Sequence, residues 1–318
     1  MKVLRLLCLV LPLMLIAAGC RSEPEKVDEF SKSLLQAAAD GNIAQVKSLL
    51  SKGADVNSKD KFGWSALHLA TAQGSEDVVK LLIDRGGDIN TKDKTGATPL
   101  HIASELGRKA LAELFLAKGA DIDARRNDGL VPLHLAVWHG RISTQGLLIA
   151  KGADVNAKLD NGRTLLHFAA QKGRGDLAES LIAKGVNVNV KDMAGVTPLH
   201  LAAIEGQKSL TEFLITNGAD VNARIWNGRT PLYFAAEGYQ MAIAELLIAK
   251  GANINMKDNN GQTILHIASG LGRREFVGLL ITKGAEINAK TDEGDTPLSL
   301  AKGDKVITEM LRKHGAKE

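Results

Sequence analysis

The sequence predicts an all-α solenoid of about nine 33-residue helix-turn-helix units that are joined by β-turn loops. Two series of glycines, each with a spacing of 33 residues, support this prediction. The first series is Gly63, Gly96, Gly129, Gly162, Gly195, Gly228, Gly261 and Gly294. The second series is Gly53, Gly86, Gly119, Gly152, Gly185, Gly218, Gly251 and Gly284. Two series in one register, without insertion or deletion, indicate that one structural unit is repeated along the chain.

Each unit begins with the signals of a helix N-terminus, of which Thr98 and Pro99 are typical. A threonine side chain accepts a hydrogen bond from a free backbone N–H, and proline suits the first helical position because no donor is needed there. Five of the seven prolines occupy this position. The helix continues through alanine-rich turns and ends at a glycine such as Gly206.

A second helix follows, with an apolar pair at one phase of the repeat, as in Leu82-Ile83 and Leu214-Ile215. It ends at the second glycine series, where a segment such as 152–156 (Gly-Ala-Asp-Val-Asn) leads into the next turn. The composition suits short helices and tight turns, because Ala, Leu and Gly are abundant and aromatic residues make up only 4% of the chain.

These motifs resemble the ankyrin repeat, whose Gly-x-Thr-Pro-Leu-His-x-Ala-Ala and Gly-Ala-Asp-Val-Asn signatures recur along nearly the whole chain after residue 31. The resemblance implies a curved solenoid over residues 32–318, with capping units at about 32–60 and 291–318. Both end units depart from the pattern. The first has Leu34-Leu35 in place of Thr-Pro, and the last has Ser299 at the histidine position and is two residues shorter from Asp304.

Residues 1–19 have the features of a secretory signal peptide, with a basic start and an apolar run, Leu6 to Ile16, that is too short to span a bilayer. The segment from Ile16 to Cys20 resembles the bacterial lipobox, although Ala17 stands where leucine is more usual. The resemblance implies cleavage before Cys20 and acylation of this cysteine, with residues 20–31 as a polar tether. The alternatives are an ordinary signal peptide with an unmodified cysteine and an uncleaved membrane anchor.

The same resemblance indicates the cell envelope as the location. No aspartate follows the cysteine, which favours the outer membrane with the protein facing the periplasm, and surface exposure is the other orientation.

Charge and cysteine content argue against several other functions. Without Lys2 and Arg5, the formal net charge of +4 becomes +2, from 38 basic and 36 acidic residues. This weak, spread charge offers no basic cluster for nucleic acid. The only cysteines are Cys8 and Cys20, so the repeat region has neither disulfides nor thiolate chemistry.

Six of the eight histidines share one phase of the repeat: His68, His101, His134, His167, His200 and His266. Neighbouring units cannot share a metal ion, because helix layers lie about 8–10 Å apart and zinc ligands lie about 2 Å from the metal. In ankyrin repeats this histidine bonds to local turn backbone, and the resemblance implies the same role here. No phosphate-binding loop, serine elbow or His–Asp pair is visible, so we predict no catalytic residue, cofactor or metal site.

The expected interaction surface is the concave face, which in ankyrin repeats is formed by the turn tips and the exposed side of the first helix. Counting from the tip glycines places Trp64, Trp138 and Trp226 there. The same count adds Phe62, Leu106, Leu130, Met193, Val196, Ile204 and Leu271, with Arg229 in a polar rim. Exposed tryptophans are typical of binding hot spots, and simple exclusion from an Ala/Leu core is the structural alternative.

The sequence therefore predicts a monomeric, membrane-anchored module that binds a protein partner and is not an enzyme. A scaffold, an inhibitor or immunity factor, and a protective adaptor are all compatible with it. The first alternative is a surface-exposed or secreted binder of a host protein. The second is an enzyme or ligand-binding protein whose site lies between repeats.

Overall fold

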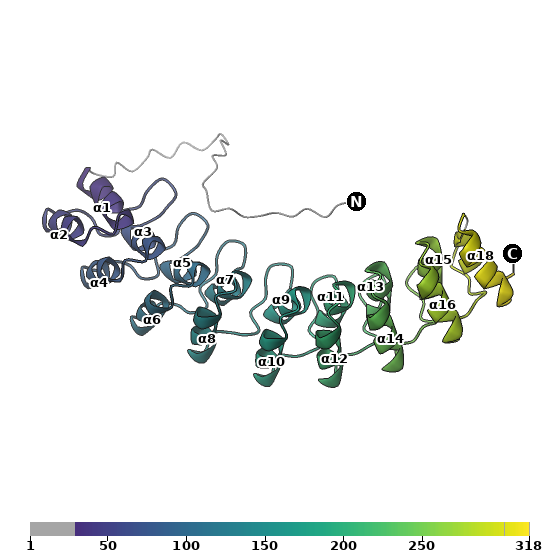
Figure 1. The fold of residues 1–318 in the computed structure, drawn as a ribbon. Coiled ribbons are helices and arrows are strands. Elements are labelled where there is room, and N and C mark those ends of the chain that lie inside the picture. Colours follow the sequence, from purple (N-terminus) through teal and green to yellow (C-terminus); the bar gives the residue numbers. More distant parts are fainter. Residues whose placement is uncertain (1–28, 302, 318) are drawn as a thin grey trace.

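The computed structural model describes residues 29–301 and 303–317 of the 318-residue chain. These residues form eighteen α-helices and no named strand, and one isolated β-bridge joins Lys59 to Ser65. The helices follow one another in an elongated, curved array whose first and last members lie at opposite ends (Figure 1). The predicted all-helical class is confirmed.

The odd-numbered helices form the inner row, along the concave side of the array (Figure 1). Their bounds are α1 Glu29–Ala39, α3 Ala66–Gln73, α5 Pro99–Leu106, α7 Pro132–Trp138, α9 Leu165–Lys172, α11 Pro198–Ile204, α13 Pro231–Glu237, α15 Ile264–Gly270 and α17 Pro297–Leu300.

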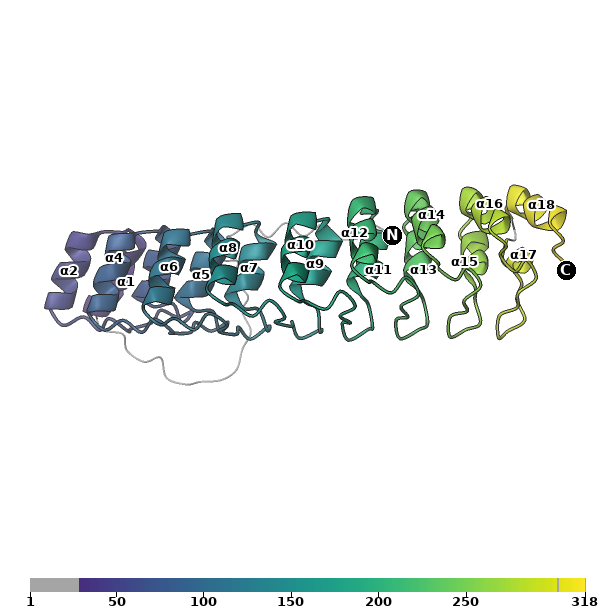
Figure 2. The same cartoon turned by 90° about the horizontal axis from the view of Figure 1, so that it is seen from below.

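The even-numbered helices form the outer row. Their bounds are α2 Ile43–Ser51, α4 Glu76–Asp84, α6 Lys109–Ala117, α8 Ile142–Ala150, α10 Gly175–Ala183, α12 Lys208–Thr216, α14 Met241–Ala249, α16 Arg274–Thr282 and α18 Lys305–Lys313. A hairpin loop connects each outer helix to the next inner helix, and these loops project from one edge of the array (Figure 2).

The first helix begins at Glu29, so the last three residues of the segment predicted as a tether are helical. Glu29 places a carboxylate in the first turn, where it interacts favourably with the helix dipole. Ser31 is buried, and its Oγ accepts a hydrogen bond of 3.1 Å from the backbone N–H of Asp55. The predicted signal peptide, residues 1–19, and the predicted acylation site Cys20 lie outside the described residues.

In several units, a histidine ring on the inner helix forms a hydrogen bond to the next hairpin loop. In α5, Nδ1 of His101 accepts a hydrogen bond of 3.1 Å from the backbone N–H of Thr98, so Nε2 carries the proton. This Nε2 then donates to the carbonyl oxygen of Leu130, 3.2 Å away in the following loop. The predicted bond of the histidine to turn backbone is confirmed, and it also bridges two units.

The hairpin loops stack on each other through their tips. The backbone N–H of Lys94 donates to the carbonyl of Phe62 over 3.1 Å, and the N–H of Trp226 donates to the carbonyl of Ala194 over 3.0 Å. The tip requires glycine for two reasons, which Gly63 illustrates. Its φ is +83°, and a Cβ there would lie 2.8 Å from the backbone nitrogen of Lys94.

Leucine and alanine fill the space between the two rows of helices. Leu100 and Ala103 on α5 are fully buried, and Phe115 on α6 is among the largest fully buried side chains. The interior is therefore built mainly from residues that recur in each unit.

The buried histidines make the stability of the array depend on pH. Burial lowers the pKa of His101 to about 4, whereas the unfolded chain has the ordinary value of about 6.5. The unfolded chain therefore binds the proton first as the pH falls. The free energy of unfolding should decrease from about pH 6.5 towards pH 4, by about 1.4 kcal/mol per pH unit for each such site.

Urea unfolding of the full chain at pH values from about 7.5 to about 5, followed by circular dichroism, measures this decrease. His101→Gln lacks one titrating group, so its stability should fall less steeply than that of the wild type. Equal slopes for the two proteins would contradict the assignment of His101 as a neutral bridge.

Candidate binding face

The concave face holds five of the predicted residues as exposed side chains. Trp226 and Met193 lie at hairpin tips and are 73% and 79% exposed. Trp138 ends α7 and is 55% exposed, and Phe62 and Leu271 are exposed to a similar degree. The predicted exposure of these five is confirmed, and they bring large apolar groups into contact with solvent on the inner side.

Four further predicted residues, Trp64, Leu106, Ile204 and Arg229, are only partly exposed. Trp64 follows the tip glycine Gly63, and its ring centroid lies 5.9 Å from that of His68, so the indole packs on the start of α3. Leu106 and Ile204 are the last residues of α5 and α11.

The predicted exposure of Leu130 and Val196 is wrong, because these side chains are only 9% and 8% exposed. Each follows a tip glycine, and its carbonyl oxygen accepts the histidine bond from the preceding unit. His101 Nε2 lies 3.2 Å from the Leu130 carbonyl, and His167 Nε2 lies 2.9 Å from that of Val196. This bond holds the residue between two units, which counting along the sequence did not anticipate.

Trp138 has an aromatic neighbour that the sequence analysis missed. Its ring centroid lies 5.6 Å from that of Phe168 on α9, with the two planes tilted by 43°. Offset aromatic pairs of this kind stabilise a contact beyond simple burial. The signal in the sequence was a phenylalanine at a repeat position where most other units have leucine or isoleucine, such as Leu135 and Ile102.

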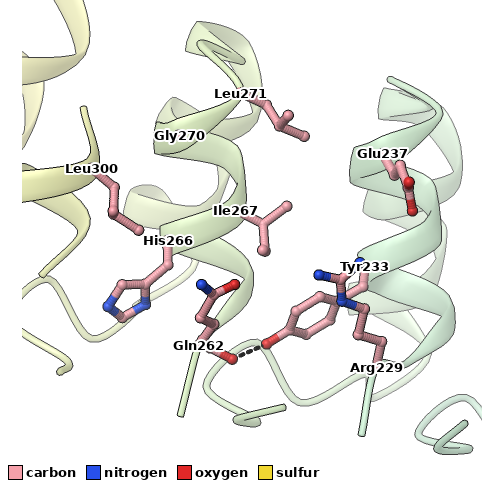
Figure 3. A pocket seen from close by; sticks show the side chains of 9 residues that line it. All are labelled: Arg229, Tyr233, Glu237, Gln262, His266, Ile267, Gly270, Leu271 and Leu300. Atoms are coloured by element: carbon pink, nitrogen blue, oxygen red, sulfur yellow. Dashed lines mark hydrogen bonds between the residues drawn. The ribbon is translucent and has the colours of Figure 1, made fainter. Parts of the chain in front are cut away.

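A pocket of about 250 Å³ opens between α13, α15 and α17 (Figure 3). The helix α13 and the loop before it contribute Arg229, Tyr233 and Glu237, and α17 contributes Leu300. The remaining lining residues come from α15 and its flanking loops, and they are Gln262, His266, Ile267, Gly270 and Leu271. The pocket joins two predicted residues, Arg229 and Leu271, to residues that the sequence analysis did not select.

Two departures from the repeat lie in the walls of this pocket. Tyr233 replaces the histidine of other units, and its hydroxyl donates to the carbonyl of Gln262 (Figure 3). Gly270 stands where other units have larger residues such as Trp138 and Ile204, and a Cβ there would meet only the Leu300 Cβ, at 3.9 Å. Both departures were visible as breaks in the period, but the cavity depends on three units together.

A buried carboxylate, that of Asp258, lies beside Arg229, the positively charged residue of the pocket lining. The Asp258 side chain is 2% exposed, and its Oδ1 accepts from the backbone N–H groups of Asn260 and Gln262 at 3.0 Å and 2.9 Å. Its Oδ2 lies 3.6 Å from Nε of Arg229. Burial raises the pKa of Tyr233, so its hydroxyl remains a hydrogen-bond donor at neutral pH.

Among the described residues, no group of three or more His, Cys, Asp or Glu side chains could hold a metal ion. Over the same part of the chain, no helix is both long and apolar enough to cross a membrane.

The family model for ankyrin repeats (three copies) matches the chain at residues 34–126, 133–225 and 206–291. These matches together cover more than half of the 318 residues. No curated protein matches the chain significantly.

Two glycines beside the pocket should respond in opposite ways to the same substitution. Gly270→Ala should raise the free energy of unfolding by about 0.5–1 kcal/mol, because alanine restricts the unfolded chain and meets open space. Gly238→Ala should lower it by about 1–3 kcal/mol, because the new Cβ would overlap the carbonyl oxygen of Ile204.

Urea unfolding of the full chain compares the two variants with the wild type. Neither glycine has a positive φ, so backbone strain does not separate them. Equal effects of the two substitutions would mean that the space beside Gly270 is not open in solution.

Proposed function

Because the chain belongs to the ankyrin repeat family, we propose that it binds a protein partner along its concave face. The observation that carries this proposal is the exposure of three large apolar side chains, Trp138, Trp226 and Leu271, of which Leu271 lines the pocket between α13, α15 and α17. Large apolar side chains that remain in contact with water favour association, and tryptophan is enriched among binding hot spots. The partner would cover these side chains and place an apolar group in the pocket.

The rigidity of the inner face supports the same proposal. The hairpin tips are tied by backbone hydrogen bonds, as between Trp226 and Ala194, and Trp138 is held against Phe168. Side chains that are already ordered lose little entropy on binding, which favours affinity. The concave face would therefore act as a preformed surface.

We further propose that the helix pairs constitute nine ankyrin units in a monomer, with the first and last units as caps over residues of about 32–60 and 291–318. The short inner helix α17 and the strongly amphipathic α18 support a capping role at the C-terminal end. Asp304 accepts hydrogen bonds from the backbone N–H groups of Val306 and Ile307, which closes the start of α18.

The sequence of residues 1–31 supports the proposal that the array is anchored to a bacterial envelope membrane by acyl groups on Cys20. Anchoring would confine the module and its partner to one surface and raise their effective concentration. The outer membrane facing the periplasm is the proposed site, and surface exposure with a host protein as partner is the alternative. A scaffold, an inhibitor or immunity factor, and a protective adaptor remain the candidate roles.

Capture from the cells that make the protein tests the concave face. A tagged full chain with Trp138→Ala, Trp226→Ala and Leu271→Ala should lose the captured partner by at least about tenfold, since each is a candidate hot spot. The control carries Ile43→Ala, Ile142→Ala and Val306→Ala, which remove exposed apolar groups from outer helices. The control should capture the partner as the wild type does, and equal capture by both variants would place the interface elsewhere.

Metabolic labelling with an alkynyl fatty acid tests the anchor. The wild-type chain should carry the label and sediment with membranes, whereas Cys20→Ser should do neither. An unlabelled wild-type chain would remove the anchor from the proposal and leave the binding function intact.

A further inference from the structure

A second pocket lies at the N-terminal end of the concave face, between α1 and the hairpin loop before α3. Its volume is about 430 Å³, within the range of about 300–1,000 Å³ that is usual for ligand pockets. Leu35 and Ala39 of α1 and Leu69 of α3 supply its apolar surface. Each of these side chains is buried or partly buried, so the pocket has an apolar floor.

The rim of this pocket carries an excess of positive charge. Lys32 of α1 and Lys59 and Lys61 of the hairpin loop surround it, and all three are exposed. Within the described part of the chain, none of the three forms an ion pair. Lys59 Nζ donates to the carbonyl of Lys92 over 2.9 Å, which orients the ammonium group without neutralising it.

The only carboxylate in the lining is already engaged. Oδ1 of Asp60 accepts from the backbone N–H groups of Phe62 and Trp64, each over 2.8 Å. These bonds shape the hairpin and direct the carboxylate towards its own backbone. The lining therefore carries three lysines against one carboxylate, and within the described residues that carboxylate forms no ion pair with any of the three.

The basic character is specific to this end of the array. We compared the three residues that precede Phe62-Gly63, 59–61, with the equivalent residues of the other hairpin loops. The first three loops have two basic residues at these positions, and each of the other five loops has one. The pairs are Lys59 and Lys61, Lys92 and Lys94, and Arg125 and Arg126. Arg126 is paired with Asp128 at 3.0 Å, so the basic pairs without any ion-pair partner in the described part of the chain are those of the first two loops.

The hairpin loop at the opposite end of the array is acidic. The last hairpin loop contains Asp292, Glu293 and Asp295. The first and last hairpin loops therefore differ in charge, which favours one orientation of a chain that contacts both.

We infer that the N-terminal pocket binds an acidic segment of a protein partner, with an apolar side chain on the floor and flanking carboxylates on the lysines. This inference rests on the proposed function and specifies the chemistry of the partner. Phe62 extends the apolar surface, because it is 51% exposed and lies beside Lys61, whose Nζ is 5.0 Å from the ring centroid. A carboxylate placed near Lys61 would meet a cation that is already positioned.

A protein segment fits these features better than a nucleic acid does. Phosphate recognition requires a continuous basic surface, whereas carboxylates such as Asp55 and Asp88 interrupt the lysines of the hairpin edge. An apolar floor of leucine and alanine also matches an aliphatic or aromatic side chain, and none of its three residues can bond to a base edge or a phosphate.

Selection of random displayed peptides on the immobilised full chain tests the inference. The enriched peptides should combine Asp or Glu with a neighbouring Leu or Phe. A synthetic peptide of the enriched sequence should bind at least about tenfold more weakly to the double variant Lys32→Glu and Lys61→Glu. Its affinity should also fall as salt is raised, because rim charges are screened.

The matched control reverses two exposed lysines at the starts of outer helices, Lys109→Glu and Lys208→Glu, where a carboxylate suits the helix dipole. This control should bind the peptide as the wild type does, and circular dichroism verifies that both variants fold. Enrichment without acidic residues, no enrichment, or binding unaffected by Lys32→Glu and Lys61→Glu would overturn the inference. The inference would also be overturned if a single-stranded oligonucleotide bound the wild type more tightly than the peptide does and the variant Lys32→Glu and Lys61→Glu abolished this binding.

The two proposals fail separately. If selected peptides lack acidic residues but lose binding with Trp226→Ala and Leu271→Ala, the concave face binds protein and only the acidic preference is wrong. If the concave-face substitutions do not change partner capture, the proposed binding along the concave face is itself wrong.

Discussion

The hydrogen bond from a histidine ring to the next hairpin loop holds neighbouring units together. His68 Nε2 lies 3.0 Å from the carbonyl of Ala97, and His167 Nε2 lies 2.9 Å from that of Val196. The other ring nitrogen accepts from the N–H at the start of the same helix, so one neutral side chain caps a helix and links two units. The positions of the hairpin tips, and with them the concave face, depend on this link.

The link is altered at α7, at α13 and at α11, where Nε2 of His200 has no hydrogen-bond partner among the described residues. The alterations at α7 and α13 coincide with apolar features of the concave face. At α7, Val131 replaces the capping threonine, and Nε2 of His134 has no hydrogen-bond partner among the described residues. Trp138 and Phe168 meet across this same junction. At α13, Tyr233 takes the place of the histidine and lines the pocket. At α7 and α13, a changed histidine link thus lies beside an apolar feature of the proposed binding surface, the Trp138–Phe168 pair or the pocket.

Charge is distributed differently from the apolar groups. Arg163 and Arg229 are each held by a buried aspartate of the next unit, at 3.2 Å from Asp192 and 3.6 Å from Asp258. The lysines at the N-terminal end have no such partner in the described part of the chain. Paired charges mainly position side chains, whereas unpaired charges at a rim attract and orient a partner.

The sequence by itself determined the helices, their caps, the buried histidines and the exposure of Trp138, Trp226 and Met193, because these depend on local signals that recur every 33 residues. Tertiary structure alone decided the rest. Leu130 and Val196 are buried at the junction with the preceding unit, whose histidine ring binds their carbonyls. The two pockets arise from side chains of two or three units, so a period within one unit carries no information about the space between them.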